Sequence, residues 1–422
     1  MRKSVKIRKI IFEVLYDIHN KNLLYEQSLK DNTKSFYLEK KDSSMIYNVS
    51  LNSMRNFYFI HIILEKYLNK KTSLKIKILL ISAITQILYL GFKDYAVTND
   101  TVEIAKIKNL NPGLINSLLK NIIKDRKLIN LKKFDYKYIP GWLIDIVKKN
   151  KDLNKQNFFN TISQEPSIHL VFKNNNFLKN FKENFISTSK QSAFITKKNK
   201  IDEINDYSLG NWWIQDFASM LPIYLSPELK NKKIIDLCSA PGGKAFQLLS
   251  MGAEIILNDI SQKRLKILKD NLKRLNWNAK IYNKDVHNIS EEQKYDVVVL
   301  DAPCSGIGTL RRNPEILFKK KSPNFKNLIQ LQNSLIFKAA KLLNPNGLLL
   351  YMVCSFNYDE TIGIKNNFLN NHKNFLHKKF ELYNNKEFSK FVDKDGDLYC
   401  TPSEYKGYMI DGFYAVKFIK HG

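Results

Sequence analysis

Hydrophobic residues in the first part of the chain recur every three or four positions. Ile10, Val14 and Ile18 show this spacing near the N-terminus, and it returns after VTND at 97–100, a segment whose residue types predict a turn. Apolar residues at this spacing line one face of an amphipathic helix. The pattern therefore predicts an all-helical bundle over residues 1–130.

Short apolar runs alternate with helical patterns from Trp212 onward. The runs read KIIDLC, AEIILND, YDVVVLDAPC and GLLLYMVCS, and the segments SQKRLKILKDNLKRLN and LIQLQNSLIFKAAKLLN have helical periodicity. Strands that alternate with helices are typical of a mostly parallel, doubly wound sheet. We therefore expect an α/β domain over 208–422, with a last strand after Gly407 that closes the edge of the sheet.

Residues 136–207, between these two parts, show a mixed pattern. YIPGWLIDIVKK predicts a helix that begins after Pro140, and SIHLVFKN predicts a strand. Stretches rich in Lys and Asn, such as FKNNNFLKNFKENF, predict irregular structure. This part is expected to be a small α+β connecting subdomain.

The longest apolar run, IKILLISAITQILYLGF at 76–92, is interrupted by Ser82, Thr85 and Gln86 and flanked by lysines. It therefore predicts a buried bundle helix rather than a membrane span. The N-terminus has no apolar signal core or small-residue cleavage site, and four cysteines in 422 residues indicate thiols rather than a disulfide framework. We expect a cytoplasmic protein with no membrane partner.

The formal net charge of +28 indicates a polyanionic partner, most plausibly nucleic acid. Charge alone does not decide this, because 8 arginines against 60 lysines is also the composition that an AT-rich genome imposes. Two of the few arginines are adjacent, Arg311 and Arg312. A guanidinium pair of this kind suits phosphate binding, so both are predicted to contact RNA.

A glycine pair lies between a predicted strand and a predicted helix in IIDLCSAPGGKAFQLL. Gly242 and Gly243 would let a ligand approach the backbone, and the start of the helix offers free N–H groups to an anionic or carboxylate-bearing ligand. The segment has neither the G-x-G-x-x-G spacing nor the Walker spacing before Lys244. It therefore predicts a ligand loop of another kind.

Three acids, Asp259, Asp285 and Asp301, end consecutive predicted strands behind this loop. A single loop aspartate is most often a turn or cap residue. Three at one edge of a sheet indicate a site instead, because open α/β sheets bind ligands at the carboxyl ends of their strands. An acid at the position of Asp259 can accept hydrogen bonds from ribose hydroxyls.

Two cysteines follow neighbouring predicted strands, Cys304 after Pro303 and Cys354 in YMVCS. A buried cysteine is by default a small hydrophobic residue, but at a strand end a thiolate can act as a nucleophile. Cys238 is expected to pack. Cys400 has no partner at metal-ligand spacing and no C-x-x-C pair exists, so no metal is expected.

The segments DLCSAPGGK, DAPCSGIGTLRRNPEI, YMVCSFNYDE and the terminal DGFY together resemble the bacterial RNA cytosine-C5 methyltransferases. NWWIQDFAS, at 211–219, is similar to the segment before the family's catalytic sheet, and the resemblance covers 140–422. AVTNDTVEIAK, at 96–106, and GLINSLLKNII, at 113–123, resemble the NusB-like RNA-binding domain. This combination resembles the RsmB (Sun) family, which methylates a cytosine in small-subunit ribosomal RNA.

The resemblance implies a Rossmann-like, S-adenosylmethionine-dependent methyltransferase domain, with Asp259 on the ribose of the cofactor, Asp285 near its adenine and Asp301 beside it. It implies that Cys354 attacks C6 of the cytosine and that Cys304 helps to release the methylated product. Asp301 would also hydrogen-bond the base, and Lys244 is hypothesised to lower a thiol pKa or to orient the base. The loop that would hold the cofactor consists of Cys238, Ser239, Ala240, Pro241, Gly242, Gly243 and Lys244.

The chain departs from the family at Val353, where a threonine usually precedes the nucleophile, and in HLVFKN, where the family commonly has an arginine-containing strand. Two alternatives stay open: the same chemistry on tRNA, and a non-catalytic RNA-binding factor of ribosome assembly. A DNA methyltransferase is disfavoured, because those enzymes use the Pro-Cys cysteine as nucleophile and do not need a second one. The expected partner is RNA, in particular small-subunit rRNA, bound by a monomer.

Overall fold

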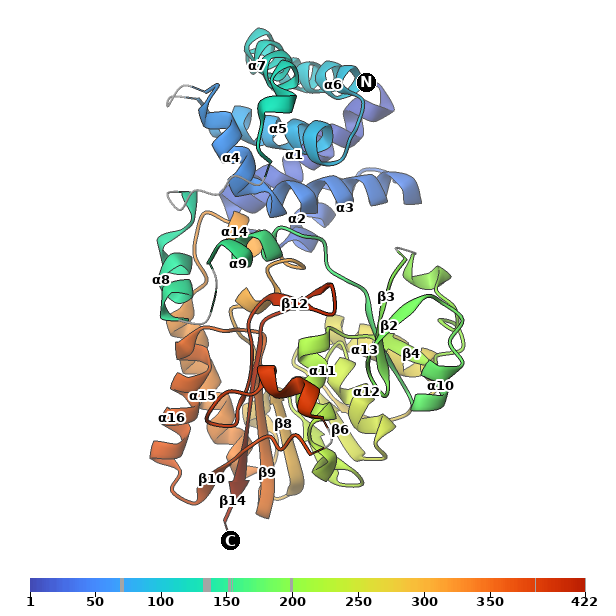
Figure 1. Cartoon of the computed structure of the whole chain (residues 1–422), viewed down its shortest axis with the longest axis vertical. Coiled ribbons are helices and arrows are strands. Elements are labelled where there is room, and N and C mark those ends of the chain that lie inside the picture. Colours follow the sequence, from blue (N-terminus) through green and yellow to red (C-terminus); the bar gives the residue numbers. More distant parts are fainter. Residues whose placement is uncertain are drawn as a thin grey trace. The chain divides into compact units, whose positions relative to one another are not determined.

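The computed structural model contains two compact units, each described here by itself (Figure 1). Unit 1 holds Met1–Glu165 and Leu310–Pro323, and unit 2 holds Pro166–Thr309 and Asn324–Gly422. The segment predicted as a connecting subdomain, 136–207, is thus divided between the units, and its first two residues lie outside the described part of the chain. The structure describes residues 1–68, 72–131, 138–150, 153, 155–197, 200–383 and 385–421.

Unit 1 is helical, as the spacing of its apolar residues predicts. One feature differs: 97–100, predicted as a turn, lies inside helix α6. There Asp100 is buried and pairs with Arg8 at 2.8 Å, so a tertiary ion pair outweighs the local preference for a turn. The helices are α1 (Lys3–Lys21), α2 (Tyr25–Thr33), α3 (Lys40–Arg55), α4 (Phe57–Glu65), α5 (Leu74–Ile84), α6 (Asp94–Ile107), α7 (Pro112–Lys124), α8 (Gly141–Lys149), α9 (Lys155–Ile162) and α14 (Glu315–Phe318).

The apolar run 76–92 is buried within this bundle, as predicted. It forms most of α5 and the π-helical turn Thr85–Tyr89, and Ile78, Leu80 and Ile84 are fully buried in the common core. No helix in the described ranges combines the length and the apolar character that crossing a membrane requires.

Unit 2 begins with a small antiparallel sheet in the order β2-β3-β1-β4. The Lys- and Asn-rich stretch predicted to be irregular instead contains helix α10 (Asn175–Lys179) and strand β2 (Phe185–Ser189). Asn174 explains the helix, because its side chain accepts hydrogen bonds from the first free N–H groups. The other strands are β1 (His169–Phe172), β3 (Ser192–Ile195) and β4 (Trp212–Ile214).

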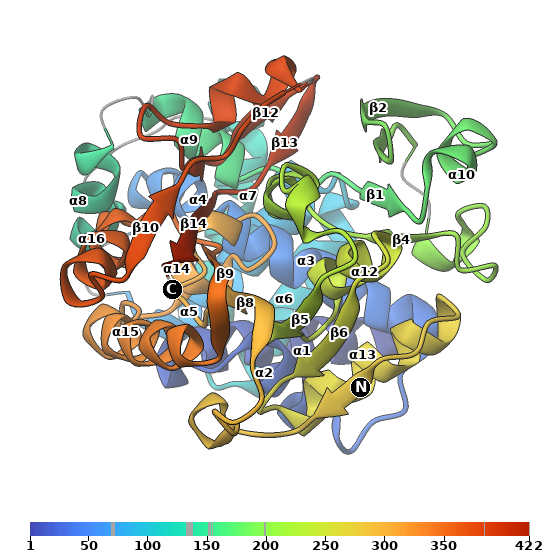
Figure 2. The ribbon, with the colours of Figure 1, turned by 90° about the horizontal axis from the view of Figure 1, so that it is seen from below.

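The large sheet of unit 2 has the order β10-β14-β9-β8-β5-β6-β7 (Figure 2). The five strands from β9 to β7 are parallel, as the sequence predicts. The C-terminal strand β14 does not close an edge, because it lies between β9 and β10 and also pairs with β11. The strands are β5 (Lys233–Asp236), β6 (Glu254–Asn258), β7 (Lys280–Tyr282), β8 (Tyr295–Asp301), β9 (Leu343–Val353), β10 (Phe375–Lys378), β11 (Leu398–Cys400) and β14 (Phe413–Lys420).

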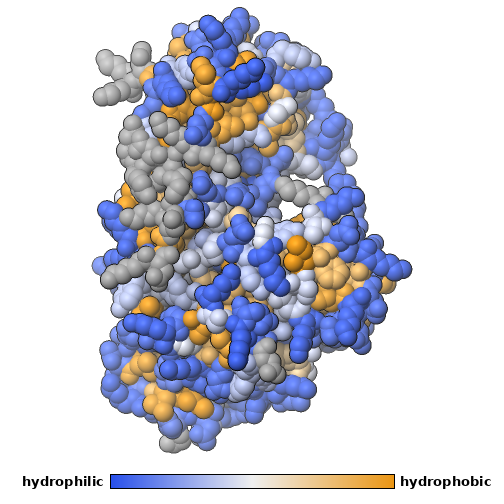
Figure 3. Space-filling model, in the orientation of Figure 1, coloured by the Kyte–Doolittle hydropathy of each residue, from blue (hydrophilic) through white to orange (hydrophobic). Residues whose placement is uncertain are grey.

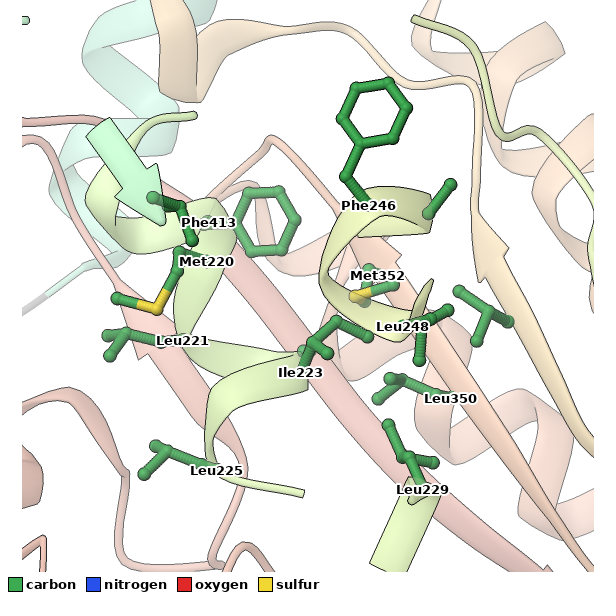
Figure 4. Packing of buried hydrophobic residues seen from close by; sticks show 14 of the residues in the cluster. Met220, Leu221, Ile223, Leu225, Leu229, Phe246, Leu248, Leu350, Met352 and Phe413 are labelled. Atoms are coloured by element: carbon green, nitrogen blue, oxygen red, sulfur yellow. The ribbon is translucent and has the colours of Figure 1, made fainter. Parts of the chain in front are cut away.

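Both faces of the large sheet are buried by helices. Alternate residues of β8 and β9 point to opposite faces, so Val299 and Met352 join one apolar cluster, and Val298 and Tyr351 join the other. Figure 4 shows Met352 and Leu350 beside residues of α11 and α12. On the visible face of the molecule, hydrophilic residues surround smaller hydrophobic areas (Figure 3). The covering helices are α11 (Phe217–Tyr224), α12 (Gly243–Ser250), α13 (Gln262–Arg274), α15 (Phe325–Lys341) and α16 (Ile362–Asn371).

Asp397 ties together the C-terminal part of this sheet. It is fully buried and accepts hydrogen bonds from Lys365 at 2.5 Å, His377 at 2.6 Å and Tyr414 at 2.7 Å. Burial by itself would raise the pKa of Asp397, but these donors outweigh it and hold the pKa below its ordinary value. The carboxylate therefore stabilises the folded state when it is ionised.

We predict that Asp397→Asn lowers the free energy of unfolding by about 3–5 kcal/mol at neutral pH, because the buried Lys365 then keeps only the exposed Asp395, 3.8 Å away, as counter-charge. Since the pKa of Asp397 is depressed in the folded state, this contribution is present above the unfolded pKa and is lost as the pH falls through the folded value. Urea unfolding of both proteins from pH 7 to pH 3 measures the difference. The exposed neighbour Asp395 is the matched control, and an equal loss in Asp395→Asn would contradict the assignment.

Candidate active site

The carboxyl ends of the parallel strands bring the polar residues of unit 2 to one edge. Asp236 ends β5, Asp301 ends β8 and Cys354 follows β9, while the strands before them are apolar and buried. Asp259 follows β6 in the same way. The structure thus gathers at one sheet edge the acids and cysteines that the sequence singles out.

The glycine loop, residues 238–244, crosses from β5 to α12 and is fixed to β6. Ser239 donates its N–H to the Asn258 carbonyl at 2.8 Å, and Ala240 donates its N–H to Asp259 Oδ2 at 3.2 Å. Gly242 has φ of 116°, and a Cβ there would lie 2.2 Å from the Phe246 ring, so the position requires glycine. Gly242 is thus buried against α12, whereas the sequence predicts that it faces a ligand.

Asp259 and Asp285 differ in their surroundings. Asp259 is buried and accepts a hydrogen bond from Ser261 N–H at 2.8 Å, with Arg264 3.4 Å away. Asp285 is about half exposed and caps the short helix that starts at Val286. Hydrogen bonds from the backbone and the ring of His287 lower the pKa of Asp285. Asp259 therefore accepts hydrogen bonds inside the protein, and Asp285 accepts them at the surface.

Lys244 and Asp301 form an ion pair at the centre of the edge. Lys244 Nζ lies 2.7 Å from Asp301 Oδ2 and 4.8 Å from the centre of the Phe413 ring. The lysine side chain is 12% exposed and the aspartate 31%, so the pair is partly shielded from water but reachable. This places a fixed cation and an acid side by side at the end of β8.

Asp236, which the sequence analysis does not single out, adds a third acid. It is fully buried. Burial, followed by the charge of Asp301, raises the pKa of Asp236 to about 7, while Lys244 acts in the opposite direction. The signal was present in KIIDLC, where an aspartate ends an apolar run just as Asp301 does.

The two cysteines are adjacent in space. Cys304 Sγ lies 3.3 Å from Cys354 Sγ, although fifty positions separate them along the chain. The hydrogen bond with Cys354, together with burial, raises the pKa of Cys304 well above its ordinary value, so this residue is a thiol at neutral pH. A thiol therefore contacts the sulfur of the second cysteine.

The other two cysteines lie in apolar surroundings. Cys400 is buried in the core, and burial raises the pKa of Cys238, with a further contribution from the charge of Asp236. Among the residues that the structure describes, no three or more His, Cys, Asp or Glu side chains are grouped so that they could hold a metal ion.

The turn that carries Cys304 is held by backbone contacts. Ala302 donates to the Met352 carbonyl at 2.9 Å, and Gly308 donates to the Cys354 carbonyl at 3.0 Å. Gly412, in the DGFY segment, donates to the Gly308 carbonyl at 2.8 Å. A Cβ on Gly308 would lie 2.0 Å from the Gly412 oxygen, so only glycine permits this approach.

A buried glutamate beneath the cysteines was not predicted from the sequence. Glu360 is fully buried, and its carboxylate accepts hydrogen bonds from Ser305 and Ser355, the residues after the two cysteines, and from Gln332.

Val353, where the family usually has a threonine, is the buried last residue of β9 and packs in the apolar core.

The arginine pair does not form the exposed phosphate site that the sequence predicts. Arg311 is 1% exposed and lies in unit 1, where its carbonyl accepts a hydrogen bond from Arg55 at 2.7 Å. A side chain buried in this way needs a rearrangement before it can bind a phosphate group, so a contact of Arg311 with RNA stays a prediction. Arg312 is exposed, and its role stays a prediction.

Two family models match the sequence. Residues 222–419 match the family described as 16S rRNA methyltransferase RsmB/F, and residues 5–124 match the NusB family. The ribosomal RNA small subunit methyltransferase B of Photorhabdus laumondii subsp. laumondii is 26% identical over 359 residues, which cover 79% of this chain and 83% of that protein. The protein of the same name from Proteus mirabilis is 23% identical over 447 residues and covers 98% of both chains.

Solved structures share the fold. The crystal structure of PH0851 has a TM-score of 0.72 at 20% identity and covers 100% of this chain and 99% of that one. A methyltransferase homolog protein from Pyrococcus horikoshii has a TM-score of 0.53 at 19% identity and covers 72% and 99%. The fold and the site thus define a methyltransferase with a Rossmann-like catalytic domain and a NusB-like N-terminal domain. The chain thus carries a domain of the RsmB/F methyltransferase family, at 222–419, behind a domain of the NusB family, at 5–124.

The short distance between the cysteines makes them a redox-sensitive pair. A disulfide needs an S–S distance of about 2.05 Å, so only a small shift separates this geometry from a bond. We predict that the oxidant diamide, which takes up the two thiol hydrogens, links Cys304 to Cys354 and leaves Cys238 and Cys400 titratable. Peptide mapping after thiol alkylation measures this, with Cys304→Ser as control. Retention of all four thiols would contradict the geometry.

Proposed function

We propose that the protein is an S-adenosylmethionine-dependent methyltransferase that forms 5-methylcytosine in small-subunit ribosomal RNA through a covalent adduct between Cys354 and C6 of the cytosine. The observation that carries the proposal is the pair of cysteines 3.3 Å apart on the sheet edge that also bears the Lys244–Asp301 ion pair. Two adjacent thiols are unnecessary for a methyl transfer that involves no covalent adduct. Methyl transfer through a covalent adduct, in contrast, gives a role to both thiols.

The glycine loop and Asp259 fit S-adenosylmethionine. Gly242 lets Phe246 and Leu268 pack against the loop, and the N–H groups at the start of α12 can receive the carboxylate of the methionine part. Asp259 is buried and its two oxygens accept hydrogen bonds from Ala240 and Ser261, so it is proposed to accept from ribose hydroxyls only after a local rearrangement, and Asp285, exposed on the same edge, is proposed to lie near the adenine. S-adenosylmethionine supplies an electrophilic methyl group.

Cys354 is the proposed nucleophile. Its sulfur forms a bond with C6, which moves the electron pair of the C5–C6 double bond toward C5 and makes C5 nucleophilic enough to accept the methyl group. Asp301 hydrogen-bonds the cytosine ring, and Lys244 beside it offsets the negative charge that moves onto the ring. A base, such as solvent water, then takes the C5 proton; the electron pair of that C–H bond restores the C5–C6 double bond, and the sulfur leaves C6 as the Cys354 thiolate.

Cys304 is proposed to act in release of the product. The contact with Cys354, together with burial, raises the pKa of Cys304, and the two sulfurs, 3.3 Å apart, can share a thiol hydrogen; the release role of Cys304 itself follows from the resemblance to the family. The two cysteines thereby take different roles although their residue types are the same. The base must leave the helical stack to reach them.

Ribosomal RNA is the proposed substrate for two reasons. The relatives that cover most of the chain are named ribosomal RNA small subunit methyltransferase B, and a NusB-family domain covers residues 5–124. The strongly basic composition suits contacts to RNA phosphates. A cytoplasmic, monomeric enzyme that uses neither a metal nor DNA is part of the same proposal.

We predict that Cys354→Ala lowers the rate of methyl transfer by roughly 10⁴-fold or more, as loss of a covalent nucleophile does in other enzymes. Cys304→Ala should instead accumulate a denaturant-resistant complex with substrate RNA, because the adduct forms but is not released. Gel electrophoresis under denaturing conditions detects this complex. Normal turnover of Cys354→Ala would overturn the nucleophile assignment, and the double variant, which should form no complex, is the control.

The substrate is tested with labelled S-adenosylmethionine and three acceptors in parallel: unmodified small-subunit rRNA, the corresponding ribosomal particle and bulk tRNA. We expect label in 5-methylcytidine from rRNA or from the particle only. Label from tRNA alone would keep the chemistry and overturn the substrate. No label from any acceptor would favour a non-catalytic RNA-binding factor.

A further inference from the structure

We propose that Glu360 is a positioning residue for the reaction, which holds the Cys304 turn and the Cys354 turn against each other through the serine that follows each cysteine. The inference rests on the proposed function, since it assumes that both cysteines act on the same base. The sequence contains the dipeptide Cys-Ser twice at this edge, as Cys304-Ser305 and Cys354-Ser355.

A single carboxylate oxygen joins the two turns. Glu360 Oε2 accepts hydrogen bonds from Ser305 Oγ at 2.5 Å and from Ser355 Oγ at 2.7 Å. Its other oxygen, Oε1, accepts from the Ser305 N–H at 2.8 Å. The turns belong to segments fifty positions apart, so this side-chain bridge adds to the backbone hydrogen bonds that Ala302 and Gly308 make to Met352 and Cys354.

The glutamate is itself held in place. Gln332, from α15, donates to Glu360 Oε1 at 3.1 Å and to the Pro303 carbonyl at 2.9 Å, so it braces the same turn from the opposite side. Tyr351 donates its hydroxyl to the Glu360 carbonyl at 2.9 Å. Glu360, Gln332 and Tyr351 are all fully buried.

The composition of this cluster favours positioning over stabilisation. A buried carboxylate is costly unless donors satisfy it, and a well-packed apolar residue of similar size is often at least as stable. Four donors here converge on one carboxylate, and three of them belong to Ser305 and Ser355, the residues adjacent to the reactive cysteines. The carboxylate instead fixes the orientation of both turns, and its charge contributes to the raised pKa of Cys304.

The test uses Glu360→Gln, which keeps the shape but replaces one acceptor oxygen by an N–H donor facing other donors. We expect kcat to fall by about 100-fold, the loss typical of reacting groups displaced by about 1 Å, with KM for RNA and for S-adenosylmethionine little changed. Glu291→Gln is the matched control, because Glu291 pairs with Lys338 on the surface of the same unit. It should behave as the wild type does.

A double-mutant cycle tests the route of the effect. If Glu360 acts through the two hydroxyls, Ser305→Ala and Ser355→Ala each lower kcat, and adding either to Glu360→Gln causes little further loss. Fully multiplicative losses would overturn the proposal. Should Glu360→Gln fail to fold, Ser355→Ala alone carries the test, since it removes one hydroxyl from the bridge.

One measurement does not depend on methyl transfer. The equilibrium between the Cys304–Cys354 disulfide and the two thiols in glutathione buffers reports their effective concentration, which we expect Glu360→Gln to lower at least about tenfold. If the wild type methylates no RNA, the proposed function fails and this measurement alone judges Glu360. An unchanged effective concentration together with a kcat within threefold of the wild type would overturn the positioning role.

Discussion

The burial of both faces of the parallel sheet is the constraint on which the rest of unit 2 depends. Residues 297–300 of β8 and 348–353 of β9 place alternate side chains in two apolar cores, so packing occupies these positions. Polar and reactive groups can enter only where the strands end, and parallel strands end at one edge. Asp236, Asp301 and Cys354 are thus brought together by the direction of the strands rather than by any affinity for one another.

At this edge the charged residues and the two cysteines form two separate groups. The Lys244–Asp301 ion pair, with Asp236 buried next to it, forms a charged half, and the pKa of Asp236 responds to that charge. The Cys304–Cys354 pair forms a half in which burial and a sulfur–sulfur contact decide protonation. In the proposed reaction the charged residues would stabilise the charge that moves onto the ring, and Cys354 would add to C6.

Much of this arrangement could be predicted from local patterns. Apolar runs ending in polar residues located the parallel strands, the glycine loop and both cysteines. The position of β14 could not be predicted, because an antiparallel strand inserted between β9 and β10 has the same local pattern as one at an edge. The burial of Arg311 could not be predicted for a related reason. An arginine near a site motif suggests phosphate binding, whereas the burial of this one depends on helices far away in the sequence. The helix across 97–100 likewise depends on the distant partner Arg8.

Glu360 shows why the support of a site is harder to predict than the site. Its distance of five positions from Ser355 is visible in SFNYDE, but Ser305 lies 55 positions away and Gln332 lies on a different helix. Reactive residues carry a signal in their own chemistry, since a cysteine at a strand end is unusual. A glutamate that only accepts hydrogen bonds has no such signal and resembles a surface residue until its donors are known. Its importance follows from the convergence of those donors, because the spacing of the two sulfurs depends on how the serines beside them are held.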